Sequence, residues 1–524
     1  MKLLLDAHNI KQYVRDRMLL NIAQLYVYQN DRIGLVGENG SGKTTLLHIL
    51  NQDLTPEEGF VTQFAKTELI PQFKKMDTTN SGGEVTQMYI YRSLDKKPEL
   101  LLADEPTTNL DTKSIENLEQ QLNAWQGAFI VVSHDREFLD HVCTSIWEIR
   151  NGDIIQYSGN YSKYLQQKEV EHRQEQLAYE KYKNEKKQLE EAIKLKEMKA
   201  QQATKKPQHL SSSEARIKGA KTYYSNKQKK LRKTVKSLET RLDQLNTVVK
   251  TKELPPIKMD ILNSNTFKHR TIFRIENLSG AIKDRLLWNS TSFNIYGGDK
   301  LAVTGSNGVG KTTLIKKMVK NQSGVTISPS VKIGYFSQNL DILELDKTIL
   351  ENVQSSSSQN ETLIRTVLAR MHFFKDDVHK SANVLSGGER VKLALTKVFL
   401  SDVNVLVLDE PTNFLDTNAI EAFESLLEAY EGSVIFVSHD RKFIDKIATR
   451  IITIHNKEIS LFEGTYDELK EKRKTKIAED TIENDKLLID MKITEVLSRL
   501  SVDPSEELEK EYQNLIRKKR ALDD

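Results

Sequence analysis

The sequence predicts an α/β protein in which one type of domain occurs twice, with a long helical hairpin between the two copies. Three observations lead to this prediction. Four short motifs recur in the same order in both halves of the chain. Apolar runs typical of buried strands precede these motifs. The segment between the copies is rich in Lys, Glu, Gln and Leu, and the length of 524 residues allows several well-buried cores.

The internal repeat is defined by matched spacing as well as by matched letters. Ser81 and Glu105 are 24 residues apart, and so are Ser386 and Glu410. The four motif pairs, with the first copy before the second, are GENGSGKTT (37–45) and GSNGVGKTT (305–313), SGGEV (81–85) and SGGER (386–390), LLLADEPTTNLD (100–111) and VLVLDEPTNFLD (405–416), and VVSHDREF (131–138) and FVSHDRKF (436–443).

The first motif pair predicts two phosphate-binding loops, each between a buried strand and a helix. Glycines let backbone N–H groups approach phosphates, and the following helix N-terminus adds its dipole. Lys43 and Lys311 are expected to reach the β and γ phosphates, while Thr44 and Thr312 ligate Mg²⁺. The residues expected to bind ATP in these loops are Gly37, Asn39, Gly40, Ser41, Gly42, Lys43, Thr44, Thr45, Gly305, Asn307, Gly308, Gly310, Lys311, Thr312 and Thr313.

Acidic residues follow an apolar strand in both copies. Asp104 and Asp409 are expected to hold Mg²⁺. The adjacent Glu105 and Glu410 are then placed to position or deprotonate the attacking water.

Two histidines, His134 and His439, each follow a further apolar strand. Their matched positions favour a contact with the γ-phosphate over the alternative, an ordinary core histidine. Together with the two glutamates they are the predicted catalytic residues.

With these motifs in place, the sequence resembles the ABC-type ATPases, whose signature is SGGE. The resemblance implies that two cassettes face head to tail, so that the signature of each closes the phosphate loop of the other. One site would pair Lys43 and Glu105 with 386–389, and the second would pair Lys311 and Glu410 with 81–84. The signature residues expected to bind ATP are Ser81, Gly82, Gly83, Glu84, Ser386, Gly387, Gly388 and Glu389.

The same resemblance assigns roles to a few isolated residues. Gln72 and Gln338 would be the Q-loop glutamines, which bind both ATP and Mg²⁺, and Asp111 and Asp416 the D-loop aspartates. Tyr13 would stack on adenine, although packing is the alternative for a lone tyrosine.

The copies differ between the Q-loop and the signature. Gln72 and Ser81 are 9 residues apart, whereas Gln338 and Ser386 are 48 apart. The first cassette is therefore expected to lack nearly all of its helical subdomain. In transporters this region docks the membrane partner, so the shortened copy argues against such docking.

The segment from 161 to 255 predicts an antiparallel helical hairpin. Pro207 interrupts it, and the five apolar residues of the second arm follow a 4-3-4-3 spacing that is typical of a coiled-coil seam; they are Leu231, Val235, Leu238, Leu242 and Leu245. The first arm has the less regular set Leu177, Tyr182, Leu189 and Ile193. Arms of ~40 residues would be about 60 Å long.

Positive charge is concentrated near the far end of this hairpin. From 205 to 233 there are ten Lys and Arg against the single acid Glu214. Such a run is suited to binding RNA phosphates. The alternative interpretation is a solvent-exposed, lysine-rich helix face without a binding role. Tyr223 and Tyr224 are placed either to stack on bases or to pack between the arms. The predicted RNA-binding tip is Lys205, Lys206, Pro207, Ser211, Ser212, Ser213, Arg216, Lys218, Gly219, Ala220 and Lys221.

Tandem cassettes joined by a basic helical linker resemble the ABC-F family of ribosome-binding ATPases, and within it the Vga-type antibiotic resistance proteins. This resemblance implies a cytoplasmic, ribosome-associated protein that uses ATP and Mg²⁺. It would bind the bacterial ribosome at the tRNA exit site, next to the P-site tRNA, with its tip directed toward 23S rRNA near the peptidyl transferase centre. Dislodged drugs would be lincosamides, pleuromutilins and streptogramin A compounds.

Three alternatives share parts of this pattern. A housekeeping ABC-F translation factor would have every ATPase motif, and an exporter ATPase pair would need a membrane partner. A DNA-organising ATPase would split one cassette around a very long coiled coil.

The expected domains are 1–160, 161–255, 256–470 and a helical extension at 471–524, in a monomer whose two ATPase domains pair within the chain. No stretch approaches the ~20 apolar residues of a membrane span, so the chain is not expected to enter a membrane by itself.

Overall fold

The structure is a computed structural model of the protein. The structure describes residues 2–14, 16–72, 82–202, 220–245, 268–282, 285–337, 340–413, 415–502 and 505–521. Of the predicted site residues, Ser81, Gln338 and the tip residues from Lys205 to Gly219 lie outside this set. The chain forms two compact units, one of Met1–Gln156 with Pro256–Asp524 and the other of Tyr157–Pro255. The expected bounds of the four domains stay predictions.

The first cassette, β1 to β9, is built on a six-stranded sheet in the order β5-β6-β7-β3-β8-β9. Its inner strands pair in parallel and are almost entirely apolar, as strands covered on both faces must be. A second, antiparallel sheet has the order β2-β1-β4. The strands are β1 (Leu3–Val14), β2 (Arg17–Tyr28), β3 (Arg32–Gly37), β4 (Glu58–Gln63), β5 (Thr67–Ile70), β6 (Leu100–Asp104), β7 (Ala128–Val132), β8 (Ser145–Arg150) and β9 (Asp153–Ser158).

The second cassette, β10 to β18, repeats this topology, with sheets β14-β15-β16-β12-β17-β18 and β11-β10-β13. The match confirms the tandem α/β architecture that the repeated motifs predict. The strands are β10 (Thr271–Ile282), β11 (Arg285–Tyr296), β12 (Lys300–Gly305), β13 (Val325–Ile327), β14 (Ile333–Phe336), β15 (Val405–Asp409), β16 (Ser433–Val437), β17 (Arg450–His455) and β18 (Glu458–Glu463).

Four helices in each cassette begin at or next to the repeated motifs. The first two follow the phosphate loop and the signature, and the other two follow the D-loop aspartate and the histidine segment. In the first cassette they are α1 (Lys43–Leu50), α2 (Gly82–Asp95), α3 (Thr112–Ala124) and α4 (Arg136–Val142). In the second they are α8 (Lys311–Val319), α11 (Gly387–Leu400), α12 (Thr417–Ala429) and α13 (Arg441–Ile447).

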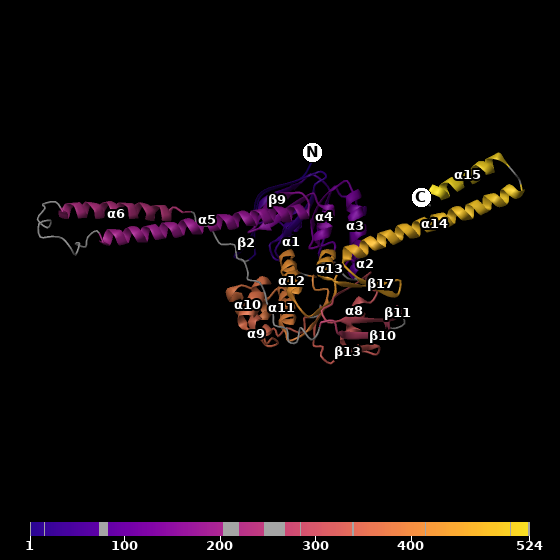
Figure 1. The fold of residues 1–524 in the computed structure, drawn as a ribbon. Coiled ribbons are helices and arrows are strands. Elements are labelled where there is room, and N and C mark those ends of the chain that lie inside the picture. Colours follow the sequence, from indigo (N-terminus) through magenta and orange to yellow (C-terminus); the bar gives the residue numbers. More distant parts are fainter. Residues whose placement is uncertain are drawn as a thin grey trace. The chain divides into compact units, whose positions relative to one another are not determined.

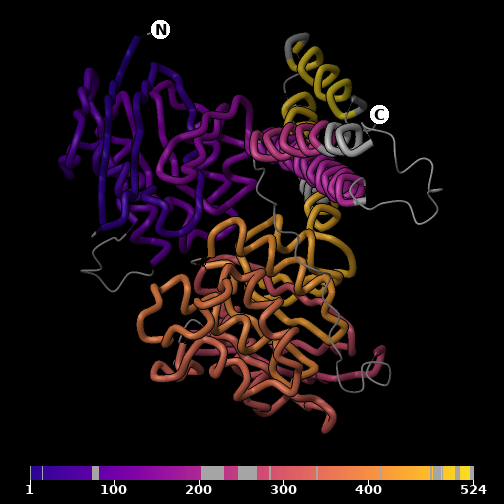
Figure 2. The backbone as a smooth tube through the Cα atoms, turned by 90° about the vertical axis from the view of Figure 1, so that its left-hand side faces the viewer, coloured from indigo at the N-terminus to yellow at the C-terminus, as the bar shows by residue number. Residues whose placement is uncertain are grey.

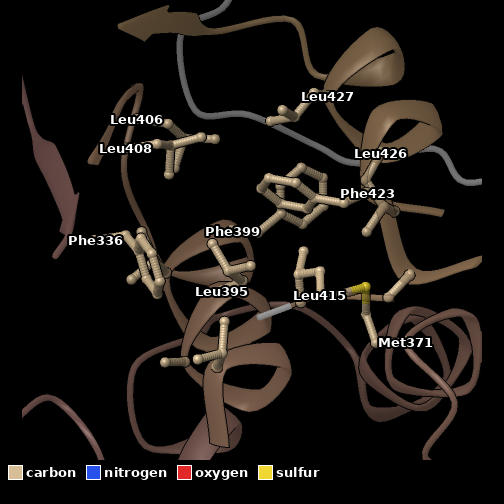
Figure 3. Packing of buried hydrophobic residues seen from close by; sticks show 14 of the residues in the cluster. Phe336, Met371, Leu395, Phe399, Leu406, Leu408, Leu415, Phe423, Leu426 and Leu427 are labelled. Carbon is tan, nitrogen blue, oxygen red and sulfur yellow. The ribbon is translucent and has the colours of Figure 1, made fainter. Parts of the chain in front are cut away.

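The second cassette alone has further helices between its sheet and its signature in the described residues. They are α9 (Ile349–Gln354), α10 (Glu361–Arg370) and the short 3-10 helices η2 (Lys375–His379) and η3 (Ala382–Val384). Figure 3 shows part of the core that they share with α11 and α12, where Phe399 and Phe423 lie close to Leu415 and Met371. In the first cassette, β5 ends at Ile70 and α2 begins at Gly82.

The unit Tyr157–Pro255 contains α5 (Tyr161–Gln202) and α6 (Ala220–Asp243), which lie side by side over much of α6 in Figures 1 and 2. Leu189 and Val235 are buried in this unit, and Arg241 forms an ion pair with Glu185 across it at 3.0 Å. The predicted helical hairpin is therefore confirmed. Leu177, one of the less regular apolar residues of the first arm, is 59% exposed.

The C-terminal extension also consists of two helices, α14 (Tyr466–Val502) and α15 (Glu506–Ala521), as predicted. The helices contact each other, and Lys519 donates to Asp490 at 2.6 Å. Val496 is buried on α14. Across the described ranges, no helix has both the length and the apolar content that crossing a membrane requires.

Candidate nucleotide sites between two cassettes

Both phosphate loops have the same geometry. Gly42 and Gly310 precede α1 and α8 with φ angles of 102° and 103°, in the left-handed region that glycine adopts without strain. Lys43 Nζ donates to Gly37 O at 2.7 Å and to Glu38 O at 2.9 Å, so the ammonium group lies over its own loop. Lys311 Nζ does the same with Gly305 O at 2.9 Å. Burial lowers the pKa of both lysines, opposed by the neighbouring carboxylates.

The glutamate that directly follows the last residue of β6 or β15 has a strained backbone. Glu105 and Glu410 have φ angles of 50° and 53°, which are uncommon for residues with a Cβ. Each is held there by its own N–H, which donates to Val132 O at 2.9 Å or to Val437 O at 3.0 Å. Burial raises the pKa of Glu410 to about 7, against the opposite effect of Lys311. Residues fixed in this way are frequent at catalytic sites.

Each predicted histidine lies next to the glutamate of its own cassette. His134 Nε2 is 3.4 Å from Glu105 Oε1, and His439 Nε2 is 3.3 Å from Glu410 Oε1. Burial lowers the pKa of both histidines to about 3, so both rings are neutral near pH 7. A neutral ring beside a carboxylate offers one N–H donor, which suits a phosphate oxygen or the attacking water.

The oxygen atoms expected at magnesium lie together in the second cassette. Thr312 Oγ1 donates to Asp409 Oδ1 at 3.0 Å. A hydroxyl and a carboxylate fit Mg²⁺, which prefers hard oxygen ligands and usually takes one or two of them together with phosphate oxygens. In the first cassette Thr44 and Asp104 hold the equivalent positions in α1 and β6.

At the second site, the first cassette reaches across to the phosphate loop of the second. The Asn307 N–H donates to Asp111 Oδ2 at 3.0 Å, and Asn307 Nδ2 donates to Asn109 O at 2.6 Å. A Cβ added to Gly83 would lie 2.7 Å from Asn307 Nδ2, so the signature helix touches the same asparagine. Signature, D-loop and phosphate loop therefore meet here.

At the first site, the D-loop contact is repeated with an additional partner. The Asn39 N–H donates to Asp416 Oδ2 at 3.3 Å, and Lys392 Nζ donates to the same oxygen at 2.8 Å. Burial would raise the pKa of Asp416, but Lys392 holds it below its ordinary value. Ser386 caps α11 in a reciprocal box with Glu389, while a Cβ added to Gly387 would meet nothing within 4 Å.

Two of the remaining predicted residues lie away from these contacts. Tyr13 is in β1 opposite Met18 and is partly exposed, with its N–H bonded to Glu57. Gln72 follows β5 and is exposed.

The structure also adds residues to which the sequence analysis gave no role, namely Asn109, Lys392, Arg136 and Arg441. The two arginines occupy the same place in VVSHDREF and FVSHDRKF, so the repeat already contained a signal for them.

Comparisons with known proteins agree with this geometry. The family described as ABC transporter matches residues 20–75 and 288–413, and another pattern with that description matches residues 147–218. Ribosome protection protein VmlR of Bacillus subtilis (strain 168) is 30% identical over 100% of this chain and 99% of its own length. Erythromycin resistance ATP-binding protein MsrA of Staphylococcus epidermidis is 32% identical over 84% of this chain and 96% of its own length.

The chain belongs to the ABC-F family. As an ABC-F protein it binds ATP and hydrolyses it to ADP and phosphate. A solved structure titled RNase-L Inhibitor has the same tandem fold, with a TM-score of 0.57 at 16% identity, and covers 88% of this chain and 91% of its own.

Proposed function

We propose that this ABC-F ATPase is a ribosome protection factor that binds the ribosome when ATP closes its two cassettes. The observation that carries the proposal is similarity along the whole chain to a protein named for ribosome protection, together with two nucleotide sites that span the cassettes. ATP bound in such sites favours the closed state, because each nucleotide contacts both cassettes. Hydrolysis removes that preference and drives release.

The residues of each site divide the work of hydrolysis. Lys43 or Lys311 neutralises the β and γ phosphates, and Glu105 or Glu410 orients the attacking water and accepts its proton. His134 or His439 contacts the γ-phosphate from the other side of the glutamate. Thr312 and Asp409 would hold Mg²⁺ in the second site, where the ion would neutralise charge on the phosphates.

The helical hairpin supplies the surface for RNA. Helix α6 contains eight Lys and Arg against two acids, and its described basic side chains from Lys229 to Arg241 are exposed. We infer that these side chains contact rRNA phosphates while the hairpin extends from the tRNA exit site, past the P-site tRNA, toward the peptidyl transferase centre. There it dislodges lincosamide, pleuromutilin and streptogramin A antibiotics.

The test is nucleotide-dependent binding of a variant that cannot hydrolyse ATP. Glu105→Gln with Glu410→Gln keeps both side-chain volumes but removes both bases, so ATP should trap the closed protein on ribosomes. Cosedimentation with 70S ribosomes should rise at least tenfold with ATP over ADP. A surface Glu458→Gln variant controls for the loss of charge. Equal recovery with ATP, with ADP and without nucleotide would reject the proposal.

Antibiotic susceptibility separates protection from a housekeeping role in translation. Cells expressing the wild-type protein should tolerate the named drugs at higher concentrations than cells expressing Lys43→Ala with Lys311→Ala. Ribosome trapping without any change in susceptibility would instead favour a housekeeping factor. Recovery in the membrane fraction, with none on ribosomes, would favour an exporter subunit.

A further inference from the structure

Two arginines cross between the cassettes immediately after the catalytic histidines. Arg136 begins α4 two residues after His134, and Arg441 begins α13 two residues after His439. Both arginines are buried, with exposures of 6% and 2%. Such burial of a guanidinium requires partners, and the ion-pair partners of both arginines belong to the opposite cassette.

The partners are two glutamates on the helices that follow the D-loops. Arg136 binds both carboxylate oxygens of Glu424 on α12, with Nη1 3.3 Å from Oε2. Arg441 binds Glu119 on α3 through Nη2. A buried guanidinium that is held by hydrogen bonds has a fixed direction as well as a fixed charge.

Other charges complete the surroundings of these pairs. Asp440 Oδ2 lies 3.7 Å from Arg136 Nη2. Lys446 Nζ also contacts Glu424, at 3.1 Å from Oε2. Around Arg441, Glu137 Oε2 lies 3.3 Å from Nε and Asp135 lies 4.0 Å from Nη2.

Each of these helices therefore touches one ATP site at two points. Asp416 caps α12 and accepts from Asn39 of the first phosphate loop, while Glu424, eight residues later, binds Arg136 next to His134. The histidine segment and phosphate loop of the first cassette are thus joined through a helix of the second.

The second site has the same arrangement. Asp111 caps α3 and accepts from Asn307, and Glu119, also eight residues later, binds Arg441 next to His439.

General stabilisation does not account for this arrangement. Replacing a buried ion pair by apolar side chains is often neutral or stabilising, so the pair itself contributes little to folding. The ion pair instead restrains position, because it fixes the start of α4 or α13 relative to the opposite cassette. The histidine two residues earlier shares that restraint.

We propose that Arg136 and Arg441 are positioning residues for ATP hydrolysis, each aligning the neighbouring histidine with the site that the opposite cassette completes. The effect is larger at one site than at the other, although each arginine also lies near the aspartate that follows the opposite histidine, Asp440 for Arg136 and Asp135 for Arg441. Arg136 serves the site of Lys43, and Arg441 serves the site of Lys311.

The test measures each site alone. Glu410→Gln leaves the first site active, and Glu105→Gln leaves the second. In the Glu410→Gln background, Arg136→Lys should lower kcat about tenfold, because misplacement of a catalytic group by about 1 Å can cost up to ~100-fold. KM should change less than about twofold, because the phosphate loop is intact. In the same background, Arg441→Lys should lower kcat less than Arg136→Lys does. In the Glu105→Gln background, Arg441→Lys should have the larger effect.

Controls separate this role from loss of the interface. Arg450→Lys makes the same chemical change at a buried arginine that pairs with Asp299 inside one cassette, and it should show no preference for either site. Thermal unfolding reports whether each variant folds. If Arg136→Lys does not fold, Glu424→Gln removes the same ion pair and should reproduce its pattern. Equal losses at both sites from either arginine, or a rise in KM at constant kcat, would overturn the proposal.

Discussion

The two cassettes reach the same catalytic arrangement with different amounts of supporting structure. In the second, α11 packs against α9 and α10 and buries nine of its residues. In the first, α2 has no such neighbours in the described residues and buries five, including Val85 and Ile90. Yet its glycines lie against Asn109, and Gln87 Nε2 donates to Ser114 Oγ at 2.6 Å. The D-loop, α3 and β5 therefore hold the first signature helix, and the described residues show no helical subdomain beside it.

The largest effect that this comparison predicts is in the core of the helical subdomain. Phe399→Ala should lower the free energy of unfolding by about 3–5 kcal/mol, because it opens a cavity beside Tyr430. Calorimetry should show an earlier transition for the second cassette. The first cassette has no residue in this cluster, so its transition should move less. If all unfolding transitions moved to lower temperature by the same amount, the two cassettes would not be stabilised independently.

A smaller effect is expected where the first signature touches the second phosphate loop. A Cβ at Gly83 would lie 2.7 Å from Asn109 O, which is backbone and cannot move away easily. Gly83→Ala should therefore destabilise the protein by about 1–3 kcal/mol. Nucleotide-free thermal unfolding measures it.

Gly82→Ala, one residue earlier in the same signature, is the control, because its added Cβ would make ordinary van der Waals contact with Asn109 at 3.4 Å or more. Equal losses from the two substitutions would show that the crowding at Gly83 does not matter.

The smallest effect concerns how α11 begins. Ser386→Ala removes one half of the capping box with Glu389 and should cost about 1 kcal/mol. Denaturant unfolding without nucleotide would measure the change. Thr348→Ala, which removes the same type of cap from α9, should cost a similar amount. A cost far above that of Thr348→Ala would mean that Ser386 has a further structural contact.

Local patterns in the sequence predicted the fold well. Apolar runs before glycine-rich loops gave the central strands β3 and β12, and the short spacing before Ser81 indicated the reduced first cassette. Periodicity was less informative on α5, where Leu177 is exposed. A helix of 42 residues with apolar side chains at irregular intervals has no single seam, so its contacts depend on where the shorter α6 lies.

The sequence predicted each motif of the candidate sites separately. It could not predict the contacts between motifs of different cassettes. Glu119 and Glu424 lie inside ordinary amphipathic helices and belong to no motif. Their arginine partners are 322 and 288 residues away along the chain. Only the folded chain brings them together, because the ion pairs depend on how two repeated units face each other.

The carboxylate of the second D-loop aspartate accepts more hydrogen bonds than that of the first. Asp416 accepts from Lys392, from Asn39 of the opposite cassette and from Ala419, where it begins α12. Asp111 accepts from Asn307 and Ser114 only, in the described part of the chain, and Gln87 stands where Lys392 does in the repeat. A saturation screen of the two positions should therefore return fewer permitted amino acids at Asp416. Substitution of Asp416 would therefore disturb three contacts, whereas substitution of Asp111 would disturb two.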